Sequence, residues 1–147
     1  QLGLELERTC TVHCVSAFGP LIVHLKNVSL PDTVGILVMH SYSGSAETMR
    51  ELIRLKSWFV FFSVSGHCPK ESVIREIPND RLLIETDSPD QQVSRDCADS
   101  CPLPLEFNDC SQLLRVANRV AVARERPLAE IIAATRANAI RAFRIVV

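Results

Sequence analysis

The sequence lacks the features that mark membrane-spanning and duplex-binding proteins. Its longest run of large apolar residues, Trp58 to Phe62, has five members, far short of the roughly 20 residues of a membrane-spanning helix. The 16 Lys and Arg residues nearly balance the 17 Asp and Glu residues, which argues against the strongly basic surface typical of duplex-binding modules. The first residues show neither an initiator Met nor a signal-peptide pattern. They resemble the end of an amphipathic helix, so we expect a fragment of a longer protein.

Phosphate-binding loops and nucleophile elbows are also missing, because no G-x-G-x-x-G, G-x-x-x-x-G-K-[ST] or G-x-S-x-G motif occurs. The six cysteines, at positions 10, 14, 68, 97, 101 and 110, form no C-x-x-C pair. The spacing of Cys97, Cys101 and Cys110 does not fit a structural zinc site. We therefore expect reduced thiols in an intracellular protein, either cytoplasmic or nuclear.

What the chain does contain is the composition of one globular domain: 147 residues, of which 47% are hydrophobic and 22% charged. Apolar runs that predict strands alternate with stretches that predict helices. The strands are expected at 10–15 (buried), 35–40, 58–64 and 81–86, and the helices at about 17–26, 45–56, 70–77 and beyond 108. Ser45 is the expected N-cap of the second helix. This order predicts an α/β fold with a parallel sheet, and we expect a long loop over 88–107.

Strong metal-ligand side chains come at the ends of three of these strands. His13 lies near the end of the first strand, His40 ends the second, and Asp87 closes the fourth. Each has a structural interpretation, a buried core histidine or a turn aspartate, but three such residues at one edge favour a shared site. Two imidazoles and a carboxylate suit zinc or a similar divalent ion, which would lower the pKa of a bound water towards about 7. His24, within a predicted helix, and His67, on a loop, fit this pattern less well.

Several blocks of the sequence resemble TatD-type metal-dependent deoxyribonucleases over nearly the whole chain. They are VHCV around His13, HSYSGSAE from His40 to Glu47, FSVSG from Phe62 to Gly66 and RLLIETDSPD from Arg81 to Asp90, with ND at Asn108 and TRANAIRAF from Thr135 to Phe143. The resemblance implies that residues 1–147 form a single partial domain. This domain would be the C-terminal half of a TIM (β/α)8 barrel, with strands five to eight in four βα units and a C-terminal helix.

The resemblance also assigns roles to individual residues. His13, His40 and Asp87 would bind one or two divalent metal ions (zinc, magnesium or manganese). Asp87 would also be catalytic by orienting or deprotonating the attacking water, and Glu85 would support the site. The substrate would be DNA, cleaved at phosphodiester bonds.

The family's His-x-His strand and bridging glutamate are absent, and a whole barrel needs about 250 residues. We therefore expect that a missing N-terminal half or self-association is needed, and that this polypeptide alone has little or no nuclease activity. Two alternatives stay open: an amidohydrolase acting on a small carbonyl substrate, and a non-catalytic truncated half-barrel that serves as an interaction module.

Overall fold

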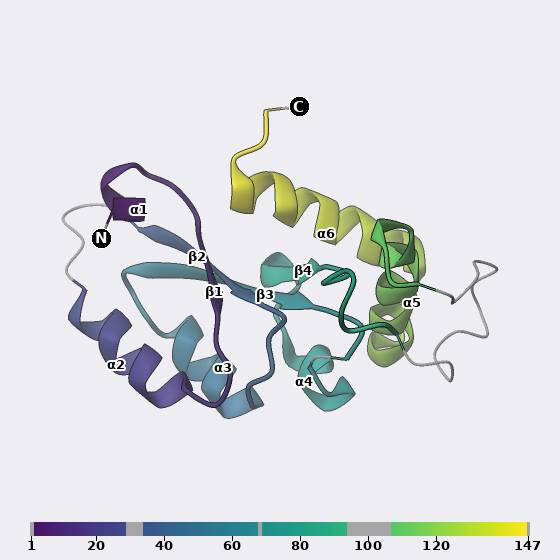
Figure 1. Ribbon diagram of the computed structural model, residues 1–147, viewed down its shortest axis with the longest axis horizontal. Coiled ribbons are helices and arrows are strands. Elements are labelled where there is room, and N and C mark those ends of the chain that lie inside the picture. The colour runs from purple at the N-terminus through teal and green to yellow at the C-terminus, as the bar shows by residue number, and fades with distance from the viewer. Residues whose placement is uncertain (1, 29–33, 68, 94–106, 147) are drawn as a thin grey trace.

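The structure, a computed structural model, describes residues 2–28, 34–67, 69–93 and 107–146. Its centre is one parallel sheet whose strands lie in chain order (Figure 1). The strands are β1 (Cys10–His13), β2 (Gly35–His40), β3 (Trp58–Val64) and β4 (Leu82–Ile84). The predicted α/β fold with a parallel sheet is confirmed, and the bounds of β2 and β3 are those expected from the sequence.

Helices follow the strands and cover both faces of the sheet. They are α1 (Leu2–Glu5), α2 (Phe18–Asn27), α3 (Ala46–Ile53), α4 (Glu71–Glu76), α5 (Leu113–Arg124) and α6 (Leu128–Phe143), with short 3-10 helices η1 (Asn79–Arg81) and η3 (Cys110–Gln112). Helices α2, α3 and α4 lie on one side of the sheet and α6 crosses the other (Figure 1). The side chain of Ser45 accepts a hydrogen bond from the backbone N–H of Thr48 at 3.2 Å, which confirms the predicted N-cap.

Alternation along each strand separates two apolar layers, because successive side chains point to opposite faces of a sheet. On β3, Val60, Phe62 and Val64 join the large core formed with α2, α3, α4 and α5. Phe61, between them, points the other way and packs with the Ala142 side chain of α6. Both faces of the central strands are therefore buried, which explains why β2 and β3 are continuous apolar runs.

The first strand is shorter and less buried than its sequence predicts. We expected a buried strand over 10–15, but β1 ends at His13, and Thr11 and His13 are exposed. β1 is an edge strand, so one of its faces lacks the cover that α6 gives to the middle of the sheet. Leu113 and Leu114, in the first turn of α5, are similarly 39% and 42% exposed.

Some expectations fall on segments without a description. Of the predicted loop over 88–107, residues 94–106 lie outside the described residues, and 88–93 form turns and irregular structure. Cys68, Cys97 and Cys101 also lie outside them, whereas Cys10, Cys14 and Cys110 are free thiols. Among the residues that are described, no helix has both the length and the apolar character needed to cross a membrane.

Tyr42 is the only tyrosine in the chain and provides a pH-dependent test of this packing. It is 1% exposed, contacts the rings of Phe18 and Phe62, and donates a hydrogen bond from its phenol to the Ser45 carbonyl at 2.7 Å. Burial raises the pKa of the phenol well above its usual value of 10.0.

We expect the ultraviolet absorbance of tyrosinate to stay low in the folded protein at pH 10 and to rise with a midpoint near pH 10 in denaturant. Because the folded pKa is the raised one, the contribution to stability is complete below pH 10 and is lost as the pH rises above it. A Tyr42→Phe variant should lose less stability above pH 10. A half-complete titration at pH 10 in the native state would contradict the buried position of this ring.

Asn138 fastens α6 to the start of β4. Its side-chain amide donates to the carbonyls of Asn79 and Leu82, each at 2.8 Å, and the residue is 6% exposed. Removing the amide leaves both carbonyl oxygens without this hydrogen-bond donor. Asn138→Ala should therefore lower the free energy of unfolding, measured by chemical denaturation, by about 1–3 kcal/mol. Arg136→Ala, an exposed change on the same helix, is the control and should stay within about 0.5 kcal/mol of the parent.

Candidate metal centre

His40 is the centre of a polar cluster at the carboxyl ends of the strands. Parallel pairing sets His13 directly opposite His40, and their ring centroids lie 5.4 Å apart. By strand alternation, His40 points to the same face as Val38, which is the face that packs against α6 lower in the sheet. The two predicted histidines are thus brought together, because both end their strands at the same level.

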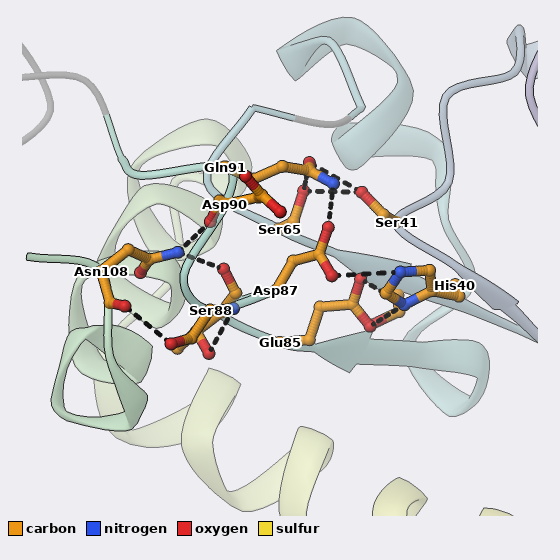
Figure 2. Close-up of polar contacts among 11 residues, drawn as sticks. His40, Ser41, Ser65, Glu85, Asp87, Ser88, Asp90, Gln91 and Asn108 are labelled. Atoms are coloured by element: carbon orange, nitrogen blue, oxygen red, sulfur yellow. Dashed lines mark hydrogen bonds and ion pairs between the residues drawn. The ribbon is translucent and has the colours of Figure 1, made fainter.

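Each nitrogen of the His40 ring faces a carboxylate from the segment that follows β4 (Figure 2). Nδ1 lies 3.0 and 3.1 Å from the two oxygens of Glu85, and Nε2 lies 3.2 Å from Oδ1 of Asp87. Ser63, at the same level of β3, donates to Oε2 of Glu85 at 2.7 Å. The side chains of His40, Glu85 and Asp87 keep between 22% and 26% of their surface exposed, so a small ligand can reach them.

The turn that carries Asp87 is fixed by Asn108. The side-chain amide of Asn108 donates to the backbone carbonyl of Thr86 at 2.7 Å and to that of Asp90, while the backbone carbonyl of Asn108 accepts from the hydroxyl of Ser88 at 2.7 Å. These bonds join the start of the segment leading to α5 to the end of β4, although about twenty residues separate them along the chain.

Backbone geometry at this edge is strained. Asp87 has a φ of 52° and Ser41, directly after β2, a φ of 43°. Both values lie in the left-handed region that residues other than glycine rarely adopt. Such conformations persist where the surrounding contacts determine them, and they gather at functional sites.

The donors fit a divalent ion in chemical type and in the spacing of one pair. Imidazole nitrogen and carboxylate oxygen are ordinary ligands of zinc and of related ions. Two such donors at about 2.1 Å from one ion stand roughly 3.0–3.4 Å apart, and His40 Nε2 and Asp87 Oδ1 are separated by 3.2 Å. Within the described part of the chain, however, no group of three or more His, Cys, Asp or Glu side chains converges on one point. The residues present thus supply a ligand pair with a neighbouring histidine.

Sequence reasoning placed some residues of this edge and missed others. His24 is exposed on α2 and His67 is exposed beyond β3, in keeping with their weaker fit to a site. Ser41, Ser65 and Gln91 were not assigned a role, although Gln91 contacts Asp87 and both serines contact Gln91 (Figure 2). Ser41 and Ser65 lie within the HSYSGSAE and FSVSG blocks, which could have marked them, whereas Gln91 lies just beyond the RLLIETDSPD block and has no such signal.

A parallel α/β sheet with histidines and carboxylates at the carboxyl ends of its strands places the protein in the class of α/β proteins whose ligands bind at this edge. A family model described as "TatD related DNase" matches residues 1–144. The chain belongs to this family, as the sequence resemblance indicated.

Individual relatives agree with that assignment. The chain is 35% identical over 142 residues to the uncharacterized metal-dependent hydrolase YabD of Bacillus subtilis, covering 86% of this chain and 51% of YabD. It is 38% identical over 63 residues to the deoxyribonuclease Tat-D of Saccharomyces cerevisiae, 40% of this chain and 15% of that protein. It is 23% identical over 151 residues to the human 3'-5' RNA nuclease TATDN2, 97% of this chain and 19% of that protein.

Solved structures confirm the fold. The crystal structure of YJJV, a TatD homologue from Escherichia coli, matches with a TM-score of 0.79 at 24% identity, covering 99% of this chain and 53% of that one. A TatD-family hydrolase from Entamoeba histolytica matches with a TM-score of 0.80 at 19% identity, over 97% of this chain and 53% of that one. The chain therefore has the TatD barrel fold over about half the length of these proteins, which confirms the predicted half-barrel architecture.

Gly66 allows the turn after Asp87 to approach β3. A Cβ atom at this position would lie 1.9 Å from the carbonyl oxygen of Gln91 and 2.7 Å from the backbone nitrogen of Val93. We expect Gly66→Ala to displace this backbone and to lower the free energy of unfolding by about 1–3 kcal/mol, the usual cost of overpacking.

Gly19→Ala is the matched control, because nothing lies within 4 Å of a Cβ there. Gly19 lies in the first turn of α2 directly before Pro20, and proline disfavours helical backbone at a preceding residue that has a Cβ. This offsets the better helix propensity of alanine, so the free energy of unfolding should change by less than about 1 kcal/mol. Both values are measured by chemical denaturation. Equal stabilities for the two variants would show that the 91–93 segment does not pack against β3 in this way.

Proposed function

We propose that this chain carries part of the active site of a metal-dependent hydrolase that cleaves the phosphodiester bonds of DNA. The observation that carries the proposal is the setting of His40, with a carboxylate on each ring nitrogen and His13 beside it. Relatives named as a metal-dependent hydrolase and as a deoxyribonuclease support this choice.

In this proposal His13, His40 and Asp87 hold one or two divalent ions, with zinc, magnesium and manganese as the candidates. Such an ion, when bound, supplies Lewis-acid charge and lowers the pKa of a coordinated water. Asp87 is the catalytic residue that orients the attacking water or accepts its proton.

Glu85 supports the site through His40. Its carboxylate lies at Nδ1, and a ligating histidine that donates its other N–H to a carboxylate has a fixed tautomer and a more basic ligating nitrogen. Ser63 holds one oxygen of Glu85 in turn. The contacts thus run from the buried hydroxyl of Ser63 to the Glu85 carboxylate and on to Nδ1 of His40. The other ring nitrogen, Nε2, faces Asp87.

The remaining ligands and the rest of the barrel wall would come from a missing N-terminal half or from self-association. The ligand pair of the described residues leaves coordination positions to fill, and β1 and β4 are the two edges of the sheet. Beside β4, a groove of about 370 Å³ is lined largely by apolar side chains, among them Leu83, Leu113, Leu114 and Ile132. An apolar groove next to a strand edge suits coverage by a packed polypeptide segment.

Metal binding can be measured on the 147-residue chain without any assay of activity. We expect calorimetry to show Mn²⁺ binding that His40→Ala and Asp87→Asn weaken at least tenfold, because each removes one member of the facing pair. His24→Ala is the matched control, since it removes an exposed histidine on α2, and it should leave binding unchanged. Equal loss in the control, or full binding in both site variants, would place the ion elsewhere.

Cleavage is tested separately on single-stranded DNA and RNA of the same sequence, with and without Mn²⁺. The proposal expects metal-dependent cleavage of DNA by an assembled barrel and loss of that cleavage in Asp87→Asn, with little turnover by this chain alone. The human relative named as an RNA nuclease makes RNA the second candidate substrate, and preferential RNA cleavage would favour it. An assembled barrel that binds Mn²⁺ and cleaves neither polymer would favour a non-catalytic module or an amidohydrolase.

A further inference from the structure

The side chain of Gln91 joins the ends of three strands at the candidate metal centre (Figure 2). Its carbonyl oxygen accepts from the hydroxyl of Ser41 at 2.8 Å and from that of Ser65 at 2.5 Å. Its amide nitrogen donates to Oδ2 of Asp87. Ser41 follows β2 directly, Ser65 follows β3 directly, and Asp87 follows β4 by three residues. We call these four residues the Gln91 clamp.

The chemistry of the Gln91 clamp fixes which way the amide points. Each serine hydroxyl carries one proton to donate, and a carbonyl oxygen can accept two. With the amide turned over, its oxygen would face the acceptor-only carboxylate of Asp87 and its nitrogen would face two hydroxyls. Because the carboxylate of Asp87 can only accept, it selects the orientation in which Gln91 donates to it. The two serine hydroxyls, which lie 3.0 Å from each other, can donate or accept, and both residues are buried, at 7% and 0% exposure.

Backbone strain shows that the surroundings determine this arrangement. Gln91 has a φ of 54°, and the other two clamp residues with left-handed backbone are Asp87 and Ser41. These conformations are unfavourable for residues other than glycine and persist only when other contacts impose them. The backbone carbonyl of Gln91 packs closely against Gly66, and Val93 is buried at 3% exposure. These two contacts hold the segment that carries Gln91 against the end of β3.

The two oxygens of Asp87 consequently have different surroundings. Oδ2 accepts from Gln91, whereas Oδ1 lies 3.2 Å from Nε2 of His40. A carboxylate with one oxygen occupied by a fixed donor presents the other in a single direction.

We propose that Gln91 is a positioning residue that holds Oδ2 of Asp87 so that Oδ1 alone faces His40 as a one-oxygen ligand. The positioning is a property of the chain itself, and its consequence for metal binding rests on the proposed function. Carboxylates that ligate metals are generally held by such outer partners, and removal of one weakens metal affinity by about 10–100-fold.

The first test needs no metal. Crystal structures of the parent chain and of Gln91→Ala are compared at the Asp87 carboxylate. We expect the parent to keep Oδ1 within about 3.2 Å of His40 Nε2 and the variant to show a rotated or disordered carboxylate whose Oδ1 has moved away from the ring. An Asp87 side chain that stays in place without Gln91 would overturn the proposal, whatever the protein hydrolyses.

The second test measures Mn²⁺ affinity by calorimetry for the parent, Gln91→Ala and Asn138→Ala. The last variant is the control for stability, because it removes one buried and one partly buried hydrogen bond at the junction of α6 with η1 and β4. Positioning predicts at least a tenfold loss of affinity in Gln91→Ala and less than a twofold change in Asn138→Ala, a difference that general destabilisation does not produce.

The two tests separate the possible failures. Equal Mn²⁺ affinity in the parent and Gln91→Ala overturns the role in metal binding. A parent chain that binds no Mn²⁺ counts against the proposed function, and the crystallographic comparison then decides the positioning of Asp87. Gln91→Glu completes the series: it keeps an acceptor for both serines but loses the donor, so Oδ1 should move away from His40 as it does in Gln91→Ala.

Discussion

Parallel pairing in register brings the carboxyl end of every strand to one edge of the sheet. Because His13 pairs with His40 and side chains alternate between faces, the two rings lie side by side on the same face. The same pairing sets Phe62 opposite Leu82, so β4 ends at the height at which Glu85 and Asp87 reach His40. A shift of one residue in any strand would turn its polar residue to the opposite face, which packs against α2, α3 and α4.

The face that carries this cluster changes character along the strands. Lower in the sheet it is apolar, where Val38, Phe61 and Leu83 pack with α6. At the carboxyl ends, His40 and Glu85 occupy positions of the same alternation. The apolar part gives the sheet its stability on this side, and the polar part remains partly exposed to a ligand. Stability and chemistry thus share one face without competing for the same residues.

Around His40 the polar groups form two levels. Glu85 and Asp87 contact the ring itself, while Ser63 and Gln91 each hold one of these carboxylates. Since a carboxylate can rotate about its last bond, the outer contacts decide which oxygen faces the histidine. The chain spans about half the length of YabD, and the metal chemistry that we propose for it depends on donors beyond those of the described residues.

The sequence by itself determined the order of strands and helices, the bounds of β2 and β3, and the placement of His13, His40 and Asp87 near the carboxyl ends of their strands, although β1 and β4 are shorter than predicted. Apolar runs and their turns are local features, and the TatD motifs are contiguous in the chain. Only the tertiary structure decided that β1 and the first turn of α5 are partly exposed, because exposure depends on which distant segment covers a face. It also decided the role of Gln91: its partners Ser41 and Ser65 lie 50 and 26 residues away, and hydrogen bonds across such distances follow from the packing of the strands and leave no pattern in the sequence.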